Sequence, residues 1–437
     1  MDIYSLLDKR FICSFCGREH YIPIKRIITK KGAISLLSSF LLDLVKGRRV
    51  LILSDNITYD VAGKRCEENL KGEYEVTSVI LKPESGKRVH AEEKYLPQIF
   101  KNAKNQDVLI AVGTGSITDM GKYVSNELKI PLISFPTAPS MNGFTSGVAA
   151  LLMRGLKITI PVKPALGILI DTRIISSAPL ELIKSGFADS LAKSFANTDW
   201  KISSMISGDF FCPLPLKITT QAEEKYINKA EELLQRNEKV ISYLMEGLSA
   251  GGFSIILAGK SSPASGGEHL ISHFFDIEAN KRKREPFSHH GLQVGLGIII
   301  SSTIYERLKG LSSREVERRL RNKKIDYDEE IKSFGKDAPL IKKEFSKKVS
   351  ILKELPKKLP SLWNEIKEKA FPLVHSSQKI RDSLKKTGCP LCFKEIGVDK
   401  SLAYKAIMTS RYIRGRLTIL DIASELGILR EIAEEFS

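Results

Sequence analysis

The sequence lacks the features that mark secreted, membrane-spanning and disordered proteins. Six cysteines in 437 residues are too few for a disulfide scaffold. The N-terminus carries acidic residues early and has no apolar stretch long enough for a signal peptide. The most apolar run elsewhere, residues 294–304, is too short to span a bilayer. No low-complexity tract or internal repeat is present either, so we expect a globular, cytoplasmic protein without membrane insertion.

Negative charge is scarce relative to positive charge. The 68 lysines and arginines against 51 aspartates and glutamates give a formal net charge of +17. Such an excess raises the possibility of a nucleic-acid partner. However, the basic residues are interleaved with acids in helical patterns such as 312–332, and no zinc finger, RNP-type motif or aromatic-plus-basic stripe accompanies them. The charge therefore favours a solvated basic surface that attracts anionic metabolites, and no nucleic-acid partner is expected.

The length and the order of apolar patterns predict two domains. Up to about residue 180, buried-strand patterns alternate with amphipathic helical patterns, which predicts a parallel sheet with helices on both faces. The strand patterns occur within 48–55, 74–81, 107–116 and 130–140, and the helical patterns within 94–106 and 117–129.

Beyond residue 180 helical periodicity dominates and strand patterns fade. We therefore predict an α/β domain over residues 1–180 and an all-helical domain over residues 181–437. Within the second domain, residues 310–388 are rich in lysine and are expected to form a helical elaboration of the surface rather than part of the core.

A glycine turn in AVGTGSITDMGKY (111–123) is the first candidate binding feature. Gly113 and Gly115 stand between a strand and a helix, where the backbone can approach a phosphate and the helix N-terminus offers N–H groups to an anion. The spacing is neither G-x-G-x-x-G, because Thr118 takes the third glycine position, nor a Walker loop. The turn predicts a pyrophosphate site, with a plain strand-to-helix turn as the alternative. Asp55 ends the first predicted strand and is either an acceptor for a ribose hydroxyl or a helix N-cap.

Four of the seven histidines lie within residues 266–291. His269 and His273 are four apart and would share one helix face, as metal ligands or as a polar surface. His289 and His290 precede an apolar, glycine-rich helix, and a histidine entering a buried helix needs a partner such as a metal. A catalytic zinc site uses three protein ligands, but the pattern alone does not select the remaining one from 51 acids.

The cysteines include two C-x-x-C pairs, Cys13/Cys16 and Cys389/Cys392, while Cys66 and Cys212 stand alone. Two such pairs can close one tetrahedral zinc site. Because the pairs lie at opposite ends of the chain, ordinary buried or surface thiols are the favoured interpretation.

Several stretches together resemble the sn-glycerol-1-phosphate dehydrogenases, within the superfamily of iron alcohol dehydrogenases, glycerol dehydrogenases and dehydroquinate synthases. They are GTGSITD (113–119), PTAPSMNGFTS (136–146), GFADSLAKSFANTDWK (186–201), SGGEHLISHFF (265–275), HHGLQVGLG (289–297), CSFCGREHYIPI (13–24) and IRGRLTILDIASELGIL (413–429). The resemblance covers nearly the whole chain apart from residues around 310–370.

The resemblance implies a dehydroquinate-synthase-like fold with an N-terminal nucleotide-binding domain, a helical second domain and an active-site cleft between them. It also implies reduction of dihydroxyacetone phosphate to sn-glycerol 1-phosphate, for the backbone of glycerophospholipids, by NADH or NADPH. The metal would be Zn²⁺ or Ni²⁺, and the protein a homo-oligomer. A glycerol or other polyol dehydrogenase, a dehydroquinate-synthase-type cyclase and a non-enzymatic binding protein are alternatives, and PTAPS and GFADSLAK count against the cyclase.

Carried over position by position, the resemblance makes Asp189, His269 and His290 the metal ligands and places His273 against the substrate, with no role for His289. Asn142 stands where the family carries an aspartate that contacts substrate, so it is a tolerated variant, a sign of another substrate, or a sign of a weakened enzyme; the first two are favoured. Residues expected to line the cofactor site, beside Gly113 and Asp55, are Gly115, Ser116, Ile117, Thr118, Asp119, Thr137, Ala138, Pro139, Ser140 and Ser146. Candidates for holding the substrate phosphate, or else solvated surface lysines, are Lys157, Lys163 and Lys193.

Overall fold

The structure, a computed structural model, describes residues 2–84, 87–153, 156–321 and 326–437. It separates into two compact units, the first made of Met1–Ser190 and Lys217–Gly259, the second of Leu191–Leu216 and Lys260–Ser437. These units differ from the predicted single division at residue 180. The reason is that helix α10 (Glu238–Ala258) packs on η5 (Asn142–Thr145) and α6 (Thr172–Ser177), which keeps it with the N-terminal sheet.

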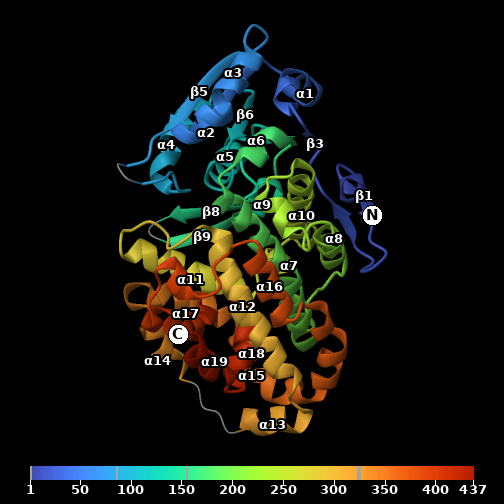
Figure 1. Ribbon diagram of the computed structural model, residues 1–437, viewed down its shortest axis with the longest axis vertical. Coiled ribbons are helices and arrows are strands. Elements are labelled where there is room, and N and C mark those ends of the chain that lie inside the picture. The colour runs from blue at the N-terminus through green and yellow to red at the C-terminus, as the bar shows by residue number, and fades with distance from the viewer. Residues whose placement is uncertain (1, 85–86, 154–155, 322–325) are drawn as a thin grey trace. The chain divides into compact units, whose positions relative to one another are not determined.

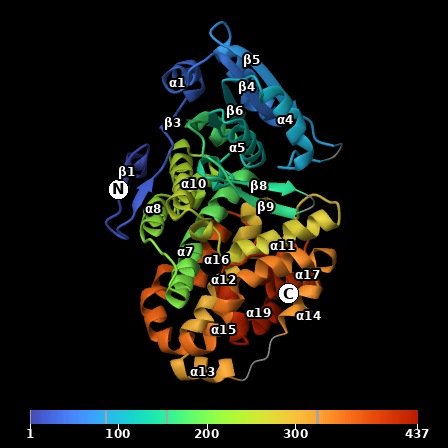
Figure 2. The ribbon, with the colours of Figure 1, turned by 180° about the vertical axis from the view of Figure 1, so that it is seen from behind.

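The first unit is built on a six-stranded parallel sheet with strand order β3-β10-β7-β6-β4-β5 (Figure 1; Figure 2 shows it from behind). Its strands are β3 (Arg26–Lys30), β4 (Arg49–Asp55), β5 (Glu75–Leu81), β6 (Val108–Val112), β7 (Leu132–Phe135) and β10 (Gly167–Asp171). The predicted parallel sheet is therefore confirmed, and all four predicted strand patterns contain a strand. Strands β3 and β10 were not predicted.

Helices cover both faces of this sheet, as its strand sequences require. Alternate residues of β4, such as Val50 and Ile52, join a core with Phe40 of α1 (Leu37–Leu44) and Leu70 of α3 (Lys64–Leu70). On the opposite face, α5 (Ser116–Leu128) lies so close to β6 that a Cβ on Gly121 would be 3.2 Å from the Ala111 Cβ. Because both faces are buried at the central strands, β6 (VLIAV) and residues 50–53 of β4 (VLIL) are continuous apolar runs rather than alternating ones. The other helices before the end of α6 are α2 (Asn56–Thr58) and α4 (Leu96–Ala103).

Two antiparallel hairpins stand apart from the sheet. They pair β1 (Arg10–Ile12) with β2 (Glu19–Tyr21) and β8 (Val148–Met153) with β9 (Leu156–Pro161). The first hairpin carries the Cys13/Cys16 pair in its turn. The remaining helices of the first unit, besides α10, include α9 (Ala230–Leu234) and most of α8 (Leu214–Glu223).

Helix α10 is the one helix among the described residues that is long and apolar enough to cross a membrane. However, 78% of its apolar window is buried inside the protein, as in a core helix. Its small residues have a packing role, because a Cβ on Gly252 would lie 1.9 Å from Thr145 Oγ1.

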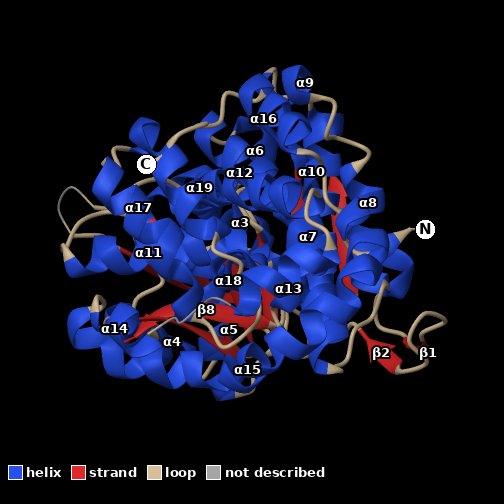
Figure 3. Cartoon of the chain, turned by 90° about the horizontal axis from the view of Figure 1, so that it is seen from below, coloured by secondary structure: helices blue, strands red, loops and turns tan. Residues whose placement is uncertain are grey.

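Every regular element described after residue 171 is helical, as predicted for the second domain (Figure 3). The long helix α7 (Leu180–Ser207) is followed in the second unit by α11 (Gly267–Lys281), α12 (His290–Lys309), α13 (Ser313–Arg321), α14 (Tyr327–Lys332), α15 (Ala338–Lys369), α16 (Ser377–Lys386), α17 (Lys400–Thr409), α18 (Ile419–Glu425) and α19 (Ile428–Phe436). Helices α11 and α12 pack so closely that a Cβ on Gly297 would lie 2.2 Å from the Glu268 carbonyl oxygen.

The lysine-rich segment 310–388 is helical, as expected, but the expectation that it lies outside the core is wrong for one face of α15. Leu352, Leu359 and Trp363 are buried at helical spacing, and Trp363 Nε1 donates to the Leu311 carbonyl at 2.9 Å. The lysines dominate the composition because they occupy the other faces of the same helix. Residues 322–325 of this segment lie outside the described residues.

One lysine of α15 is buried in an ion pair. Lys348 Nζ lies 2.8 Å from Asp421 Oδ1 of α18, with no exposed surface on either side chain. It also donates to the carbonyls of Arg411 at 2.6 Å and Arg416 at 3.2 Å. Burial lowers the pKa of Lys348 from 10.5 to about 8, against the opposing effect of Asp421.

This shifted pKa predicts a pH dependence of stability. Since the folded pKa of Lys348 lies below its unfolded value, the unfolded chain binds more protons at this residue between pH 8 and 10.5. Its contribution to the free energy of unfolding therefore rises with pH across that window and is lost as pH falls through about 8. In denaturant titrations, the difference between the wild-type chain and a Lys348→Met variant should grow from pH 8 to pH 10. Parallel pH curves for the two proteins would contradict this assignment.

Candidate active site

The predicted cofactor residues lie at the carboxyl ends of neighbouring strands. Asp55 ends β4, the glycine turn follows β6, and residues 136–140 follow β7. In open parallel sheets, ligands bind at this edge. Gly113 and Gly115 have φ angles of +151° and +60°, which L side chains rarely adopt, so both glycines are required by the turn itself.

Thr114 fastens the glycine turn to the PTAPS stretch. Its hydroxyl donates to the Ala138 carbonyl at 2.9 Å and accepts from the N–H groups of Thr137 at 3.2 Å and Ala138 at 3.1 Å. The two stretches that the resemblance assigns to the cofactor are therefore one connected surface of the first unit. Thr114 itself was not predicted, because a hydroxyl between two glycines carries no distinctive pattern.

Lys122, which was not predicted from the sequence, joins α5 to the loop that follows the PTAPS stretch. Its side chain is fully buried on α5 and lies 2.9 Å from Asp119 Oδ1. It also donates to the Gly143 carbonyl at 2.7 Å, to Ser146 Oγ at 3.1 Å and to the Val148 carbonyl. Asp119 and Ser146, both expected to line the cofactor site, thus have a structural role in holding the 142–148 loop. Their contact with a cofactor stays a prediction.

Asp55 is the N-cap of α2. Its carboxylate accepts from the Thr58 N–H at 2.7 Å and from the Thr58 hydroxyl at 2.9 Å, in a capping box. The helix-cap alternative is confirmed, and the ribose contact stays a prediction.

Asp189, His269 and His290 come together in the structure. Asp189 lies on α7, His269 on α11, and His290 is the first residue of α12, and one ligand atom from each lies within 4.8 Å of the others. Asp189 and His269 are 1% and 5% exposed. The group contains one carboxylate and two imidazoles, a donor set typical of catalytic divalent-metal sites.

Contacts around the imidazoles set their orientation. His269 Nδ1 lies 2.8 Å from Glu268 Oε1, which also accepts from the Gly266 N–H at 2.7 Å. His290 Nδ1 lies 3.3 Å from Ser272 Oγ. Each ring is therefore engaged through Nδ1, so coordination would use Nε2. Carboxylate and hydroxyl partners of this kind fix the tautomer and direction of metal-binding histidines, so the residues present fit a metal ion.

Beneath this site, Asp199 holds the start of α11. Asp199 Oδ2 accepts from the Gly267 N–H at 2.8 Å, and Oδ1 accepts from the Tyr305 hydroxyl at 2.6 Å and the Ile419 N–H at 3.1 Å. Burial, and after it the neighbouring Glu268 carboxylate, raise the pKa of Asp199 to about 8. This network positions the helix that carries His269.

Comparisons with known proteins show which family this chain belongs to. Residues 28–179 match the family of iron-containing alcohol dehydrogenases. A Halalkalibacterium halodurans protein named glycerol-1-phosphate dehydrogenase (NAD(P)+) is 35% identical over 67% of this chain and 73% of its own length. A protein of the same name from Bacillus velezensis is 30% identical, covering 87% of this chain and 86% of its own. The chain belongs to the glycerol-1-phosphate dehydrogenase family. It is an NAD(P)-dependent oxidoreductase.

Solved structures give the same fold at much lower identity. A sulfoacetaldehyde reductase from Bifidobacterium kashiwanohense has a TM-score of 0.61 at 14% identity, covering 95% of this chain and 98% of its own. A probable glycerol dehydrogenase from Sinorhizobium meliloti has a TM-score of 0.60 at 14% identity, covering 95% and 98%. The predicted combination of a parallel sheet and a helical second region is thereby confirmed.

Within this family site, His273 lies beside the three grouped residues and is not one of them. Its ring is stacked on that of His290 with centroids 6.0 Å apart, and its Nδ1 is 3.9 Å from Asp276 Oδ2. Gln293 Nε2 donates to Asp276 Oδ1 at 3.1 Å, so Asp276 is held in place. The substrate contact of His273 stays a prediction. The basic run after α11 is exposed at Arg282 to Arg284, as expected of a connecting loop.

The PTAPS loop of this family member approaches α7 very closely. Ser185 Oγ donates to the Ser140 carbonyl at 3.1 Å, and a Cβ on Gly186 would lie only 1.6 Å from the Pro139 carbonyl oxygen. Asn142, further along the loop, is 9% exposed, and its carbonyl accepts from the Thr145 hydroxyl at 3.3 Å. Gly186 is thus required by backbone contact, although its φ is ordinary.

Gly186→Ala should therefore lower stability and weaken cofactor binding. The new methyl group cannot fit without moving the PTAPS backbone, and such overpacking costs about 1–3 kcal/mol or more. Thermal unfolding and NADH titration would measure both effects. Ser185→Ala is the matched control, because it removes one hydrogen bond on the same turn of α7 and should cost about 1 kcal/mol. Equal behaviour of the two variants would contradict the close approach.

Proposed function

We propose that this chain reduces dihydroxyacetone phosphate to sn-glycerol 1-phosphate with NADH or NADPH, in the formation of glycerophospholipid backbones. The observation that carries the proposal is the convergence of Asp189, His269 and His290 within 4.8 Å, in a chain similar to proteins named for this activity. One of these, from Geobacillus thermodenitrificans, is 29% identical over 94% of this chain and 96% of its own.

Asp189, His269 and His290 would hold a divalent metal, Zn²⁺ or Ni²⁺. One carboxylate and two neutral imidazoles leave such a cation with a net positive charge of about one. When bound, the cation supplies Lewis acidity that stabilises negative charge developing on the substrate carbonyl oxygen. Glu268 and Ser272 hold the two imidazoles in position through Nδ1. Because the imidazoles would already be in position before the reaction begins, no reorganisation would be needed as negative charge develops on the substrate.

His273 would supply the proton that the reduction requires. Reduction adds a hydride from the nicotinamide to the carbonyl carbon and a proton to the carbonyl oxygen. His273 has 14% of its side chain exposed, its ring is stacked on that of His290, and its Nδ1 lies 3.9 Å from the Asp276 carboxylate. In this proposal His273 delivers the proton to the new hydroxyl oxygen.

The cofactor would lie along the edge of the sheet. The pyrophosphate would meet the N–H groups of the glycine turn and the start of α5, and the Asp55 carboxylate would accept from the ribose. The PTAPS residues Thr137 to Ser140, joined to the turn by Thr114, would form the facing wall.

Lys193 is the favoured residue for the substrate phosphate. It lies four residues after Asp189 on α7 and therefore on the same helix face, and it is 1% exposed, so the surface-lysine alternative is wrong for this residue. Lys163 is exposed and Lys157 half-buried, on or just after β9. Lys193 Nζ donates to the Ala264 carbonyl at 3.4 Å, and a buried ammonium would attract a dianionic phosphate more strongly than a solvated one.

An oxidation assay tests the proposed function. NADH and NADPH would be offered with dihydroxyacetone phosphate, dihydroxyacetone and glyceraldehyde phosphate in turn, with Zn²⁺ or Ni²⁺ supplied, and chiral analysis would identify the product. Dihydroxyacetone phosphate should be reduced fastest. Absorbance that stays flat with all three substrates, while metal and cofactor are bound, would overturn the proposal. The homo-oligomer that the resemblance implies is tested by sedimentation of the same preparation.

Asn142 favours one second candidate, reduction of a related polyol precursor. Asparagine keeps hydrogen bonding to a hydroxyl but loses the charge of the family aspartate. If dihydroxyacetone phosphate is the natural substrate, Asn142→Asp should change kcat/KM on it by tenfold or less, which is under about 1.4 kcal/mol of barrier. A hundredfold rise would show that the unsubstituted chain acts on a different carbonyl compound.

A further inference from the structure

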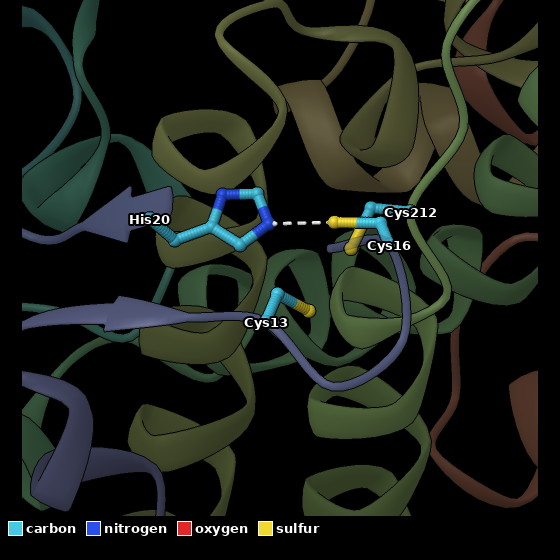
Figure 4. Close-up of side chains that lie close together, drawn as sticks. All are labelled: Cys13, Cys16, His20 and Cys212. Carbon is cyan, nitrogen blue, oxygen red and sulfur yellow. Dashed lines mark hydrogen bonds between the residues drawn. The ribbon is translucent and has the colours of Figure 1, made fainter. Parts of the chain in front are cut away.

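A second group of potential metal ligands lies around the first hairpin, apart from the proposed catalytic residues. It consists of Cys13, Cys16, His20 and Cys212, and one ligand atom from each lies within 4.8 Å of the others. Figure 4 shows the four side chains pointing toward one another. Three thiols and one imidazole are the donor set of a structural zinc site. The second C-x-x-C pair, Cys389 and Cys392, takes no part in this group, so the interpretation that joined the two pairs is not the one the described residues support.

The turn between β1 and β2 has the backbone of a metal-binding knuckle. The Cys13 N–H donates to the Arg18 carbonyl at 2.9 Å, and the Gly17 N–H donates to the Cys13 carbonyl at 2.8 Å. Gly17 has a φ of +70°, which a side chain would strain. This tight turn brings Cys13 and Cys16 to the same side, and it places His20, on the antiparallel strand β2, opposite them.

The separations suit a tetrahedral centre. Zn–S bonds of about 2.3 Å at tetrahedral angles set sulfur atoms about 3.8 Å apart, and Zn–N bonds of about 2.0 Å bring nitrogen slightly closer. Cys16 Sγ lies 3.3 Å from His20 Nε2, and no pair in the group exceeds 4.8 Å. Changes of no more than about one ångström in these separations would therefore place all four atoms on one ion.

The surroundings also fit a closed structural site. Cys13, His20 and Cys212 are 3%, 6% and 0% exposed and Cys16 is half-buried. Four protein ligands would fill a tetrahedral zinc site and leave no position for water or substrate. The ring of His20 forms a hydrogen bond with the backbone of Leu257, the type of outer contact that fixes a ligand imidazole. Three thiolates around Zn²⁺ carry a net charge of about −1, and Arg18 lies near enough to act electrostatically on His20.

Cys212 is brought to the hairpin by the start of α8. It stands two residues before that helix, and Lys217 Nζ on α8 lies 4.9 Å from the centroid of the Phe15 ring, inside the C-x-x-C turn. The cation–π contact is an independent sign that the start of α8 packs on this turn. We infer that Cys13, Cys16, His20 and Cys212 bind a structural zinc ion that fastens the N-terminal hairpin to the segment leading into α8.

A redox role for the C-x-x-C pair fits the group less well. A catalytic dithiol needs an exposed attacking sulfur, whereas Cys13 is 3% exposed, the half-buried Cys16 Sγ lies 3.3 Å from His20 Nε2, and the pair converges with two further potential ligands. Zinc keeps thiolates reduced and requires no partner protein.

Cobalt substitution of the full chain tests the inference without any variant. Of the two groups of potential ligands among the described residues, the Asp189, His269 and His290 group contains no sulfur, so thiolate-to-cobalt charge transfer in the near ultraviolet would report the cysteine site. Expected results are this band together with the strong visible absorption of tetrahedral cobalt, both displaced by Zn²⁺. A cobalt-loaded chain without the band would overturn the inference, as would a Cys13–Cys16 disulfide in protein purified under reducing conditions.

Metal counting by mass spectrometry separates this site from the proposed function. Cys13→Ser and Cys212→Ser should each lower zinc by about one ion per chain, and Cys392→Ser is the matched control with no loss. Asp189→Ala should keep the charge-transfer band while losing the other ion. Unchanged zinc content in Cys13→Ser would overturn the inference even if the enzyme is active. If both cysteine variants fail to fold, the cobalt spectrum of the unsubstituted chain still decides the question.

Discussion

Replacing His290 by alanine is expected to lower kcat/KM by about a thousandfold or more, which is about 4 kcal/mol of barrier, and to release the catalytic metal. The same result is expected for Asp189→Ala and His269→Ala. Each variant leaves two of the three grouped ligands, and the 1% exposure of Asp189 leaves little room for water to replace a lost ligand. Steady-state kinetics and metal analysis of the same preparations measure the two effects together.

His289→Ala is the matched control for this experiment. It removes the neighbouring imidazole, which belongs to the N-cap residue of α12, forms no side-chain capping hydrogen bond and lies outside the group, so metal content and kcat/KM should stay close to those of the wild-type chain. His273→Ala should keep the metal and lose turnover, because the proposed role of His273 is proton transfer. If His273→Ala loses the metal while His269→Ala keeps it, the assignment of ligands is wrong.

Asp421→Asn is expected to cost about 3–5 kcal/mol of the free energy of unfolding. Asp421 Oδ1 lies 2.8 Å from Lys348 Nζ and 3.4 Å from the Arg411 guanidinium, and all three side chains are fully buried. Removing the carboxylate that faces both cations leaves two buried positive charges, while Arg411 keeps its ion pair with Glu425 at 3.3 Å and its hydrogen bond to the Tyr412 hydroxyl. Denaturant unfolding followed by circular dichroism measures the loss.

Two further variants provide comparisons for the loss of stability expected in Asp421→Asn. Lys348→Met should cost less than Asp421→Asn, because Arg411 still compensates the carboxylate that remains. Glu317→Gln breaks an exposed pair with Arg321, whose side chains are 46% and 73% exposed, and should change stability by less than about 0.5 kcal/mol. A cost for Asp421→Asn no larger than that of Glu317→Gln would show that the buried pair contributes nothing.

Much of the first unit could be predicted because buried parallel strands have a strong pattern. Residues 50–53 of β4 (VLIL) are a continuous apolar run, and the glycine turn marks where β6 ends and α5 begins. Strand β3, RIITK, was missed because it is short and charged at both ends, and the hairpin of β8 and β9 was missed because nothing marks it locally. The prediction that the lysine-rich segment lies outside the core was wrong for a related reason. Composition does not reveal that Leu352, Leu359 and Trp363 share one buried face of α15.

The sequence by itself determined the fold class, the glycine turn and the presence of metal-binding residue types, because backbone preference and hydrophobic period act over a few residues. The tertiary structure alone decided which of these residues meet. Residue spacing paired His269 with His273 and did not select a third ligand, whereas the family resemblance named Asp189, His269 and His290, and one ligand atom from each of these lies within 4.8 Å of the others in the structure. It likewise grouped Cys13 and Cys16 with Cys212 rather than with the second cysteine pair. Ligand geometry depends on how helices distant in sequence pack, and packing depends on all their contacting side chains at once.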